Sequence, residues 1–348
     1  MSTRFILYLA LLSAITITST HATEPKPGES FGAKKTEIPH WFKDSFLEFE
    51  DDIAEATDEN KRVMLYFHQD GCPYCARLVD ENFGDPVIEA YIKKHFDGIT
   101  LNIVGDREVI SIAGQSFTEK TFSAALNVQY TPTLIFLNES GKVALRLNGY
   151  YPPDEFRAAL NYVAEKHELK YNFSSYIAQN SKPVNNDLIP EDFYNHSSQL
   201  SGLIGQDKPP LAVYFESGSC DECSTLHERI LTDKTTRDLV TSMTNVQFDI
   251  HSNKTITTPD GRQTTVAKWA QQLNIGYTPS VVFFNAKGAE VMRIDAFLKT
   301  FHFQSVYDYV LTKAYITQPR FQRFISKRAD KIREAGFNTD IWGYESSH

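Results

Sequence analysis

The chain has 348 residues, which predicts two domains on the usual scale of about 150 residues per domain. An apolar content of 41% is sufficient for two packed cores and excludes a disordered protein. A formal charge of −9 argues against nucleic acid as a partner, because affinity for the phosphate backbone comes chiefly from Lys and Arg.

Residues 1–22 have the pattern of an export signal. Arg4 supplies a positive charge, residues 5–17 are mostly apolar, and Thr20-His21-Ala22 resembles a small-residue cleavage site. The apolar run is shorter than the roughly 20 residues that cross a bilayer as a helix. We expect cleavage after Ala22 and a soluble, periplasmic mature protein, with a retained N-terminal anchor as the alternative.

The first unit, residues 23–182, begins with a predicted buried strand at Val63–Phe67. This strand ends just before Cys72-x-x-Cys75, on which a helix is expected to start. Asp85-Pro86 has the pattern of a helix N-cap and first helical position. The remaining predicted elements are a helix to residue 96, a strand at 99–104, a helix leading to 126–128, a strand after residue 132, its hairpin partner at 143–147 and a closing helix at 153–167.

The second unit, residues 183–348, repeats this order. Leu211–Phe215 precedes Cys220-x-x-Cys223, 148 residues after the first pair, and a second Tyr-Thr-Pro motif follows downstream. The unit is predicted to close with a helix at residues 303–314.

Composition places the boundary between the units near residues 180–188, because residues 180–210 are rich in Asn, Ser, Pro and Gly. The basic, amphipathic segment at 319–334 has a counterpart after the first unit. We therefore predict a docked structural helix there, with a membrane-surface or partner helix as the alternative.

The four cysteines all lie in these two pairs. A cysteine at the start of a helix lies beside unpaired backbone amides and the positive end of the helix dipole, which favours its thiolate. Cys72 is therefore the predicted main nucleophile, and Cys75 is the thiol that resolves the mixed disulfide. Cys220 and Cys223 are the corresponding candidates in the second unit.

Proline opens a predicted buried strand in both units, at Thr131-Pro132 and at Thr278-Pro279. Proline cannot donate a hydrogen bond to the strand ladder, so this position predicts a special backbone site such as a cis peptide. A strand, Cys-x-x-Cys, helix and Thr-Pro strand in this order resemble the thioredoxin fold.

That resemblance implies an α/β protein of two tandem thioredoxin-like domains, each a central mixed sheet flanked by helices. It also implies thiol–disulfide oxidoreductase activity without a cofactor or metal. In that fold the cis-proline loop packs against the disulfide and lines the substrate groove. The implied substrate-binding residues are Pro73, Tyr74, Thr131, Pro132, Thr278 and Pro279.

The first unit also resembles a narrower group, the periplasmic thioredoxin-like proteins encoded with bacterial sulfur-oxidation systems. The matching segments are Tyr66–Cys75, Glu81–Phe83, Leu101–Val109 and Tyr130–Thr133. This resemblance implies a reductase of cysteine-containing periplasmic proteins, sulfur-carrier proteins among them, that takes electrons from a membrane or periplasmic thiol donor.

Thioredoxins carry a buried acid six residues before the first cysteine, and here Tyr66 and Tyr214 stand in its place. His68 and Glu216, four residues before each first cysteine, are candidate replacements as proton acceptors. The alternative, which we expect, is that both are solvent-facing residues at strand ends.

The two cysteine pairs differ in charge. Pro73-Tyr74 adds none, whereas Asp221-Glu222 places two carboxylates beside Cys220, which is expected to raise the pKa of its thiol. A disfavoured thiolate corresponds to a more reducing disulfide. The second pair is therefore expected to be either a poor catalyst or an internal electron donor to the first.

Other functions remain open at this stage. A structural zinc site is one alternative, but 144 residues separate the two cysteine pairs. This is far more than the roughly 15–20 residues typical of such a site, so the spacing argues against zinc. A disulfide oxidase or isomerase, or a peptide-binding chaperone with inert disulfides, would use the same motifs. Residues 105–119 and 253–265 are either partner-selecting segments or surface hairpins without a function.

Overall fold

The computed structural model describes residues 26–180, 187–218 and 220–346. The predicted export signal and its cleavage site lie outside these residues. Within this part of the chain, no helix is long and apolar enough to cross a membrane.

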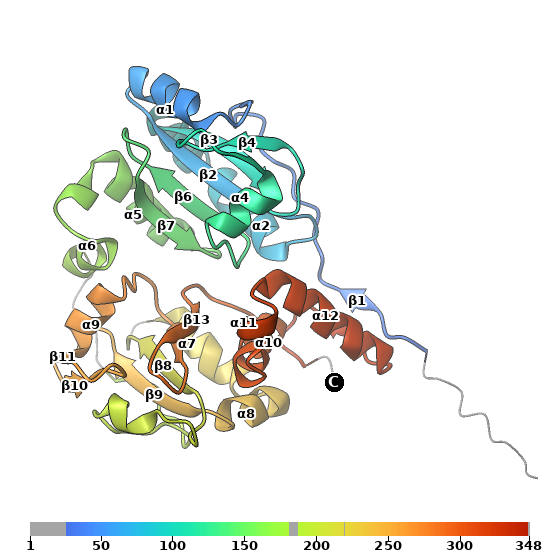
Figure 1. Ribbon diagram of the computed structural model, residues 1–348, viewed down its shortest axis with the longest axis vertical. Helices are drawn as coiled ribbons and strands as arrows, with labels where there is room; N and C mark the ends of the chain where they lie inside the picture. The colour runs from blue at the N-terminus through green and yellow to red at the C-terminus, as the bar shows by residue number, and fades with distance from the viewer. Residues whose placement is uncertain (1–25, 181–186, 219, 347–348) are drawn as a thin grey trace, which may run out of the picture.

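The chain folds into two α/β domains (Figure 1). The elements up to the boundary are β1 (Ser30–Phe31), α1 (Phe49–Asp58), β2 (Arg62–His68), α2 (Pro73–Arg77), η1 (Leu78–Phe83), α3 (Pro86–His95), β3 (Phe96–Asn102), β4 (Glu108–Ile110), β5 (Ser116–Thr118), α4 (Glu119–Ala125), β6 (Thr133–Leu137), β7 (Val143–Asn148), α5 (Pro153–Ala164), η2 (His167–Leu169) and α6 (Phe173–Asn180). The elements after it are η3 (Leu200–Leu203), β8 (Leu211–Glu216), α7 (Asp221–Thr225), η4 (Leu226–Ile230), α8 (Lys234–Thr241), β9 (Thr244–Asp249), β10 (Thr255–Thr257), β11 (Gln263–Thr265), α9 (Val266–Gln272), β12 (Ser280–Phe284), β13 (Glu290–Ile294), α10 (Thr300–Leu311), α11 (Ala314–Thr317), α12 (Phe321–Glu334) and β14 (Thr339–Asp340).

Each domain is built on a mixed four-stranded sheet. The strand orders are β3-β2-β6-β7 and β9-β8-β12-β13. In both sheets the strand before the cysteine pair runs parallel to one neighbour and antiparallel to the strand after Thr-Pro. The predicted fold class is therefore confirmed, and the two sheets have the same topology.

Strand β2 is buried on both faces, which explains its nearly continuous apolar sequence. Val63, Leu65 and Phe67 pack with α1 and α4 on one face. Met64 and Tyr66 belong to the core on the other face, which contains the cysteine pair and continues into the second domain. The strand thereby fixes the cysteines at the end of a rigid, fully packed element.

Several predicted boundaries shift by a few residues. Asp85 caps α3 as predicted, accepting hydrogen bonds from two backbone amides. Strand β3 starts at Phe96 rather than at residue 99, and it ends at Asn102, whose side chain accepts a hydrogen bond from the amide of Val104 and turns the chain. Helix α5 ends at Ala164 because Lys166 adopts a left-handed conformation. Helix α10 begins at Thr300, three residues earlier than predicted.

The last helix of each domain packs against the other domain. The Phe321 ring at the start of α12 contacts the Tyr130 ring of the first domain, with 5.4 Å between their centroids. Phe173 at the start of α6 lies against Gly276 of the second domain. The prediction of a docked helix at residues 319–334 is therefore confirmed, since Phe321 is fully buried. The segments at 105–119 and 253–265 form the hairpins β4–β5 and β10–β11.

Candidate active sites at the two cysteine pairs

Cys72 occupies the N-cap position of α2, as the sequence predicts. Its sulfur accepts a hydrogen bond from the backbone amide of Cys75 at 3.1 Å, and the two cysteines are joined as a disulfide. Cys75 is fully buried. The first sulfur therefore lies at the positive end of the helix, where backbone N–H groups stabilise a thiolate.

The Thr-Pro loop of the first domain lies directly beside this sulfur. The Thr131–Pro132 peptide bond is cis, as is the bond between Thr278 and Pro279, so the predicted cis peptides are confirmed. The carbonyl oxygen and the hydroxyl of Thr131 both lie 3.4 Å from the Cys72 sulfur. The structure thus brings together the residues that the sequence assigned to one site.

The second domain covers the first cysteine pair. Cys72 is 4% exposed and Tyr74 is 5% exposed. The Tyr74 hydroxyl accepts a hydrogen bond from the backbone amide of Lys299 at 2.8 Å, and burial raises its pKa. The Tyr74 ring packs edge-on against His302 and Trp342, at centroid distances of 5.1 and 5.0 Å. Tyr74, which was expected to contact substrate, therefore contacts the second domain of the protein.

Helix α12 covers the Thr-Pro side of the same site. The side-chain amide of Gln322 donates a hydrogen bond to the carbonyl oxygen of Gln129 at 3.0 Å and accepts one from Gln69 at 3.2 Å. The Tyr130 hydroxyl donates to the carbonyl oxygen of Arg293 at 2.7 Å. These contacts close the region that lines the substrate groove in the predicted fold.

The second cysteine pair has the same local geometry but is more open. Cys220 is the N-cap of α7, and its sulfur accepts a hydrogen bond from the amide of Cys223 at 3.0 Å. Cys223 is buried, whereas Cys220 is partly exposed and lines a cleft of about 810 Å³. The cleft lies between the domains, and residues from both contribute to it: Cys220, Tyr277, Thr278, Pro152, Asp154 and Glu155.

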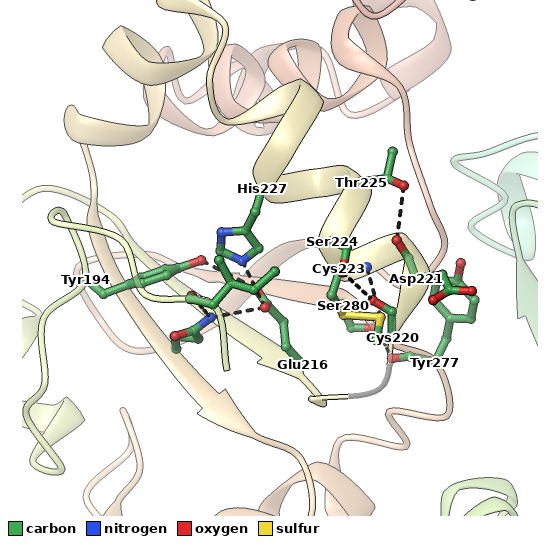
Figure 2. The surroundings of a disulfide bond; sticks show 12 residues. Tyr194, Glu216, Cys220, Asp221, Cys223, Ser224, Thr225, His227, Tyr277 and Ser280 are labelled. Atoms are coloured by element: carbon green, nitrogen blue, oxygen red, sulfur yellow. Dashed lines mark hydrogen bonds and ion pairs between the residues drawn. A yellow bond between two sulfur atoms is a disulfide. The ribbon is translucent and has the colours of Figure 1, made fainter. Parts of the chain in front are cut away.

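The expectation that Glu216 faces solvent is wrong. Glu216 is 1% exposed, and its carboxylate accepts a hydrogen bond from Gln247 at 3.1 Å and pairs with Nε2 of His227 at 3.0 Å. The Tyr194 hydroxyl also donates to it, at 3.4 Å. Figure 2 shows Glu216, His227 and Tyr194 on one side of the second disulfide and Asp221 and Tyr277 on the other.

His227 is the functional candidate that the sequence analysis missed. Its Nδ1 atom lies 3.0 Å from Glu191, so the imidazole joins two carboxylates. Burial acts to lower the pKa of His227, but hydrogen bonds and charges from Glu216 and Glu191 outweigh it and raise the pKa above its ordinary value. The signal available in the sequence concerned its partner Glu216: residues alternate between the two faces of a strand, so Glu216 shares a face of β8 with buried Tyr214.

The corresponding face of the first domain carries no buried acid at this position. His68 is half-buried, and burial lowers its pKa. Tyr66 is fully buried, and its hydroxyl has no hydrogen-bond partner within the described residues. Tyr214, at the same place in the second domain, shares a hydrogen bond with the Tyr307 hydroxyl. The two domains therefore differ most in the polar groups beneath their cysteine pairs.

Across the described residues, no three His, Cys, Asp or Glu side chains are grouped so that they could hold a metal ion.

A family model described as a thioredoxin-like domain matches the chain twice, at residues 49–164 and 197–311. No curated protein matches the chain. Among solved structures, the chain is similar to a thioredoxin-fold protein from Helicobacter pylori, with 23% identity over 35% of this chain and 80% of that one and a TM-score of 0.32. It is also similar to a thioredoxin from Thermus thermophilus, with 21% identity, coverage of 40% and 89%, and a TM-score of 0.28. A disulphide isomerase from Xylella fastidiosa shows 20% identity, coverage of 32% and 79%, and a TM-score of 0.24.

Proposed function

The chain belongs to the thioredoxin-like domain family and, with a Cys-x-x-Cys disulfide in each of two domains, is a thiol–disulfide oxidoreductase; we propose that it acts as a reductase of disulfides in exported proteins. The observation that carries this proposal is the position of the first cysteine of each pair at a helix N-terminus. There its sulfur accepts a hydrogen bond from the backbone amide of the second cysteine. The predicted export signal supports a periplasmic location.

The reaction uses the two cysteines of a site in turn. The thiolate of the first cysteine attacks a substrate disulfide, which forms a mixed disulfide and releases one substrate sulfur as a thiolate that takes up a proton. The second cysteine then attacks the mixed disulfide and releases the other substrate thiol. Two electrons pass to the substrate, and the site becomes a disulfide that a partner thiol must reduce again.

The charge beside the second site supports the reductive direction. Asp221 and Glu222 follow Cys220 directly, and their carboxylates oppose its thiolate form. A site that disfavours the thiolate holds its disulfide more strongly and is a better reductant as a dithiol. We assign the second site as the donor of electrons and the first site, with Cys72 as nucleophile, as their acceptor within the chain.

The substrates in this proposal are cysteine-containing periplasmic proteins, and the resemblance of the first unit extends it to sulfur-carrier proteins. The electron source is a membrane or periplasmic thiol donor. In the structure Cys72 is covered and Cys220 lines a cleft. Partners are therefore expected to meet the second site first, while exchange at Cys72 requires the second domain to move.

The test is the redox potential of each site in the intact protein. The mature protein and its Cys72→Ser and Cys220→Ser variants are equilibrated in graded glutathione buffers, their thiols are trapped, and each site's oxidation is measured by mass spectrometry. Reduction of insulin disulfides is measured in parallel. We expect both sites well below the potential of strong oxidants, with the second site lower than the first.

A first site that titrates near about −120 mV, the range of strong disulfide donors, would make the protein an oxidase. Equal or reversed potentials would remove the internal transfer from the second site to the first while leaving a reductase. Insulin reduction that survives in a variant carrying both Cys72→Ser and Cys220→Ser would contradict catalysis by these cysteines and favour a binding role.

A further inference from the structure

The cleft beside Cys220 is strongly asymmetric in charge. Glu155, Asp221 and Glu222 line it and form no ion pair within the described part of the chain, and Asp154, also in the lining, pairs with Arg157. None of the described lining residues is Lys or Arg. A surface of this kind attracts cationic groups and repels anionic ones.

Two of these carboxylates come from α7, next to the reactive sulfur, and Glu155 comes from the first turn of α5 in the first domain. Burial raises the pKa of Glu155, and the charges of Glu222 and Asp154 raise it further. The two domains thus hold like charges close together across the cleft, an arrangement that a bound cation would relieve.

A second, independent feature of the cleft is an unused hydrogen-bonding group. Tyr277 lines the cleft and is 5% exposed, and its hydroxyl has no hydrogen-bond partner within the described residues. The equivalent Tyr130 of the first domain donates its hydroxyl to a backbone carbonyl at 2.7 Å. A buried hydroxyl without a partner is costly; because this oxygen is itself buried, a carbonyl oxygen of a bound polypeptide would satisfy it once the side chains around it shift.

We propose that the cleft beside Cys220 binds polypeptide segments in which Lys or Arg residues flank the disulfide that is reduced. The cationic side chains pair with Glu155, Asp221 and Glu222, while Ile250, Ala270 and Ile275 provide the apolar part of the lining. This inference rests on the proposed exchange reaction, here between the substrate and the open second site itself rather than by transfer through the first site, and it adds the class of substrate to that reaction.

The bound disulfide is reduced in the same two steps. The Cys220 thiolate forms a bond to one substrate sulfur, and the other substrate sulfur leaves and is protonated. Cys223 then forms the Cys220–Cys223 disulfide and releases the second substrate thiol. Dithiothreitol regenerates the dithiol in the assay and supplies the two electrons.

The probes are three synthetic peptides that differ only in the residues flanking one intramolecular disulfide: four Lys, four Glu or four Ser. The protein carries Cys72→Ser and Cys75→Ser, so that only the second site reacts, and kcat/KM is measured at low and at high salt with a fixed supply of dithiothreitol. The test variant is Glu155→Gln with Glu222→Gln. The control is Glu50→Gln with Asp58→Asn, which removes the same charge from α1, far along the chain from the cleft.

We expect the Lys peptide to react about tenfold faster than the Ser peptide at low salt, and the Glu peptide to react more slowly than both. High salt and the test variant should each reduce this preference to about twofold or less, whereas the control should retain it. Removing the carboxylates of Glu155 and Glu222 can also raise the general reactivity of Cys220. The kcat/KM of each charged peptide is therefore divided by that of the Ser peptide in the same variant.

Equal rates for all three peptides would overturn the inference and leave the exchange reaction intact. A preference that the control variant also loses would assign the effect to net charge and overturn it as well. If no peptide is reduced above the rate with dithiothreitol alone, the proposed reaction at the second site is itself contradicted.

Discussion

Trp342 is the side chain whose removal should most selectively expose the first cysteine pair. Its ring packs edge-on against Tyr74 at 5.0 Å, and the ammonium of Lys34, from the first unit, lies 5.5 Å from its centroid. An aromatic pair contributes about 0.5–1.5 kcal/mol, and a cation–π contact at a partly exposed site about 0.5–1 kcal/mol. Trp342→Ala should therefore weaken the cover of Cys72 by about 2 kcal/mol, which is about a 30-fold shift towards the open form.

The assay is alkylation of the reduced, folded protein with iodoacetamide, followed peptide by peptide with mass spectrometry. Cys72 should react about 30-fold faster in the variant, while Cys220 should keep its rate and serve as an internal reference. Ile316→Ala is the control, because Ile316 is 67% exposed. An unchanged Cys72 rate in a variant with an unchanged melting temperature would refute the reasoning that Trp342 helps to hold this site closed.

Three predictions concern pH and stability, each measured by urea unfolding. The pKa of His227 is raised in the folded state. Its contribution to the stability of the folded protein is therefore present below about pH 6.5 and is lost as the pH rises through the folded-state pKa. His227→Gln should accordingly lower the free energy of unfolding most near pH 6 and least near pH 9. Hydrogen bonds from Arg62 lower the pKa of Glu139 to about 2. The stability that this carboxylate adds to the folded protein is present above the ordinary carboxyl pKa and is lost as the pH falls through about 2. Glu139→Gln should cost about 1–2 kcal/mol at pH 7, a modest figure because Glu139 is 35% exposed, and almost nothing at pH 2. Asp85→Ala removes the cap of α3 and should cost about 1 kcal/mol.

The sequence was sufficient for the fold and for the position of each cysteine because these depend on local patterns. A buried strand, a cysteine at a helix start and a proline before the next strand lie within each repeat, so their relative placement follows from one supersecondary arrangement. The same reasoning located the cis peptides and the caps. Element ends moved by two or three residues where a left-handed residue or a side-chain turn decided them.

The cover of the first site was not accessible to the same reasoning. Lys299 and Trp342 reach Tyr74 from more than 220 residues away, and no local pattern predicts a contact of that separation. Glu216 is a different case. Its alternation with buried Tyr214 predicts burial, but the residue type favoured solvent, because a carboxylate is rarely buried without a partner. The partner, His227, lies on a helix eleven residues later.

The difference in access between the two sites arises from the segments that come after the two repeats. After α6, the described chain runs onto the second sheet, where Tyr194 pairs with Asn245. After α12, it turns back through β14, pairs with the N-terminal strand β1 and brings Trp342 against Tyr74. Two cysteine pairs with the same N-cap geometry therefore have different surroundings, one enclosed by the chain and one lining a cleft. Opening the first site requires breaking contacts between domains, whereas partners can reach the second site without that step.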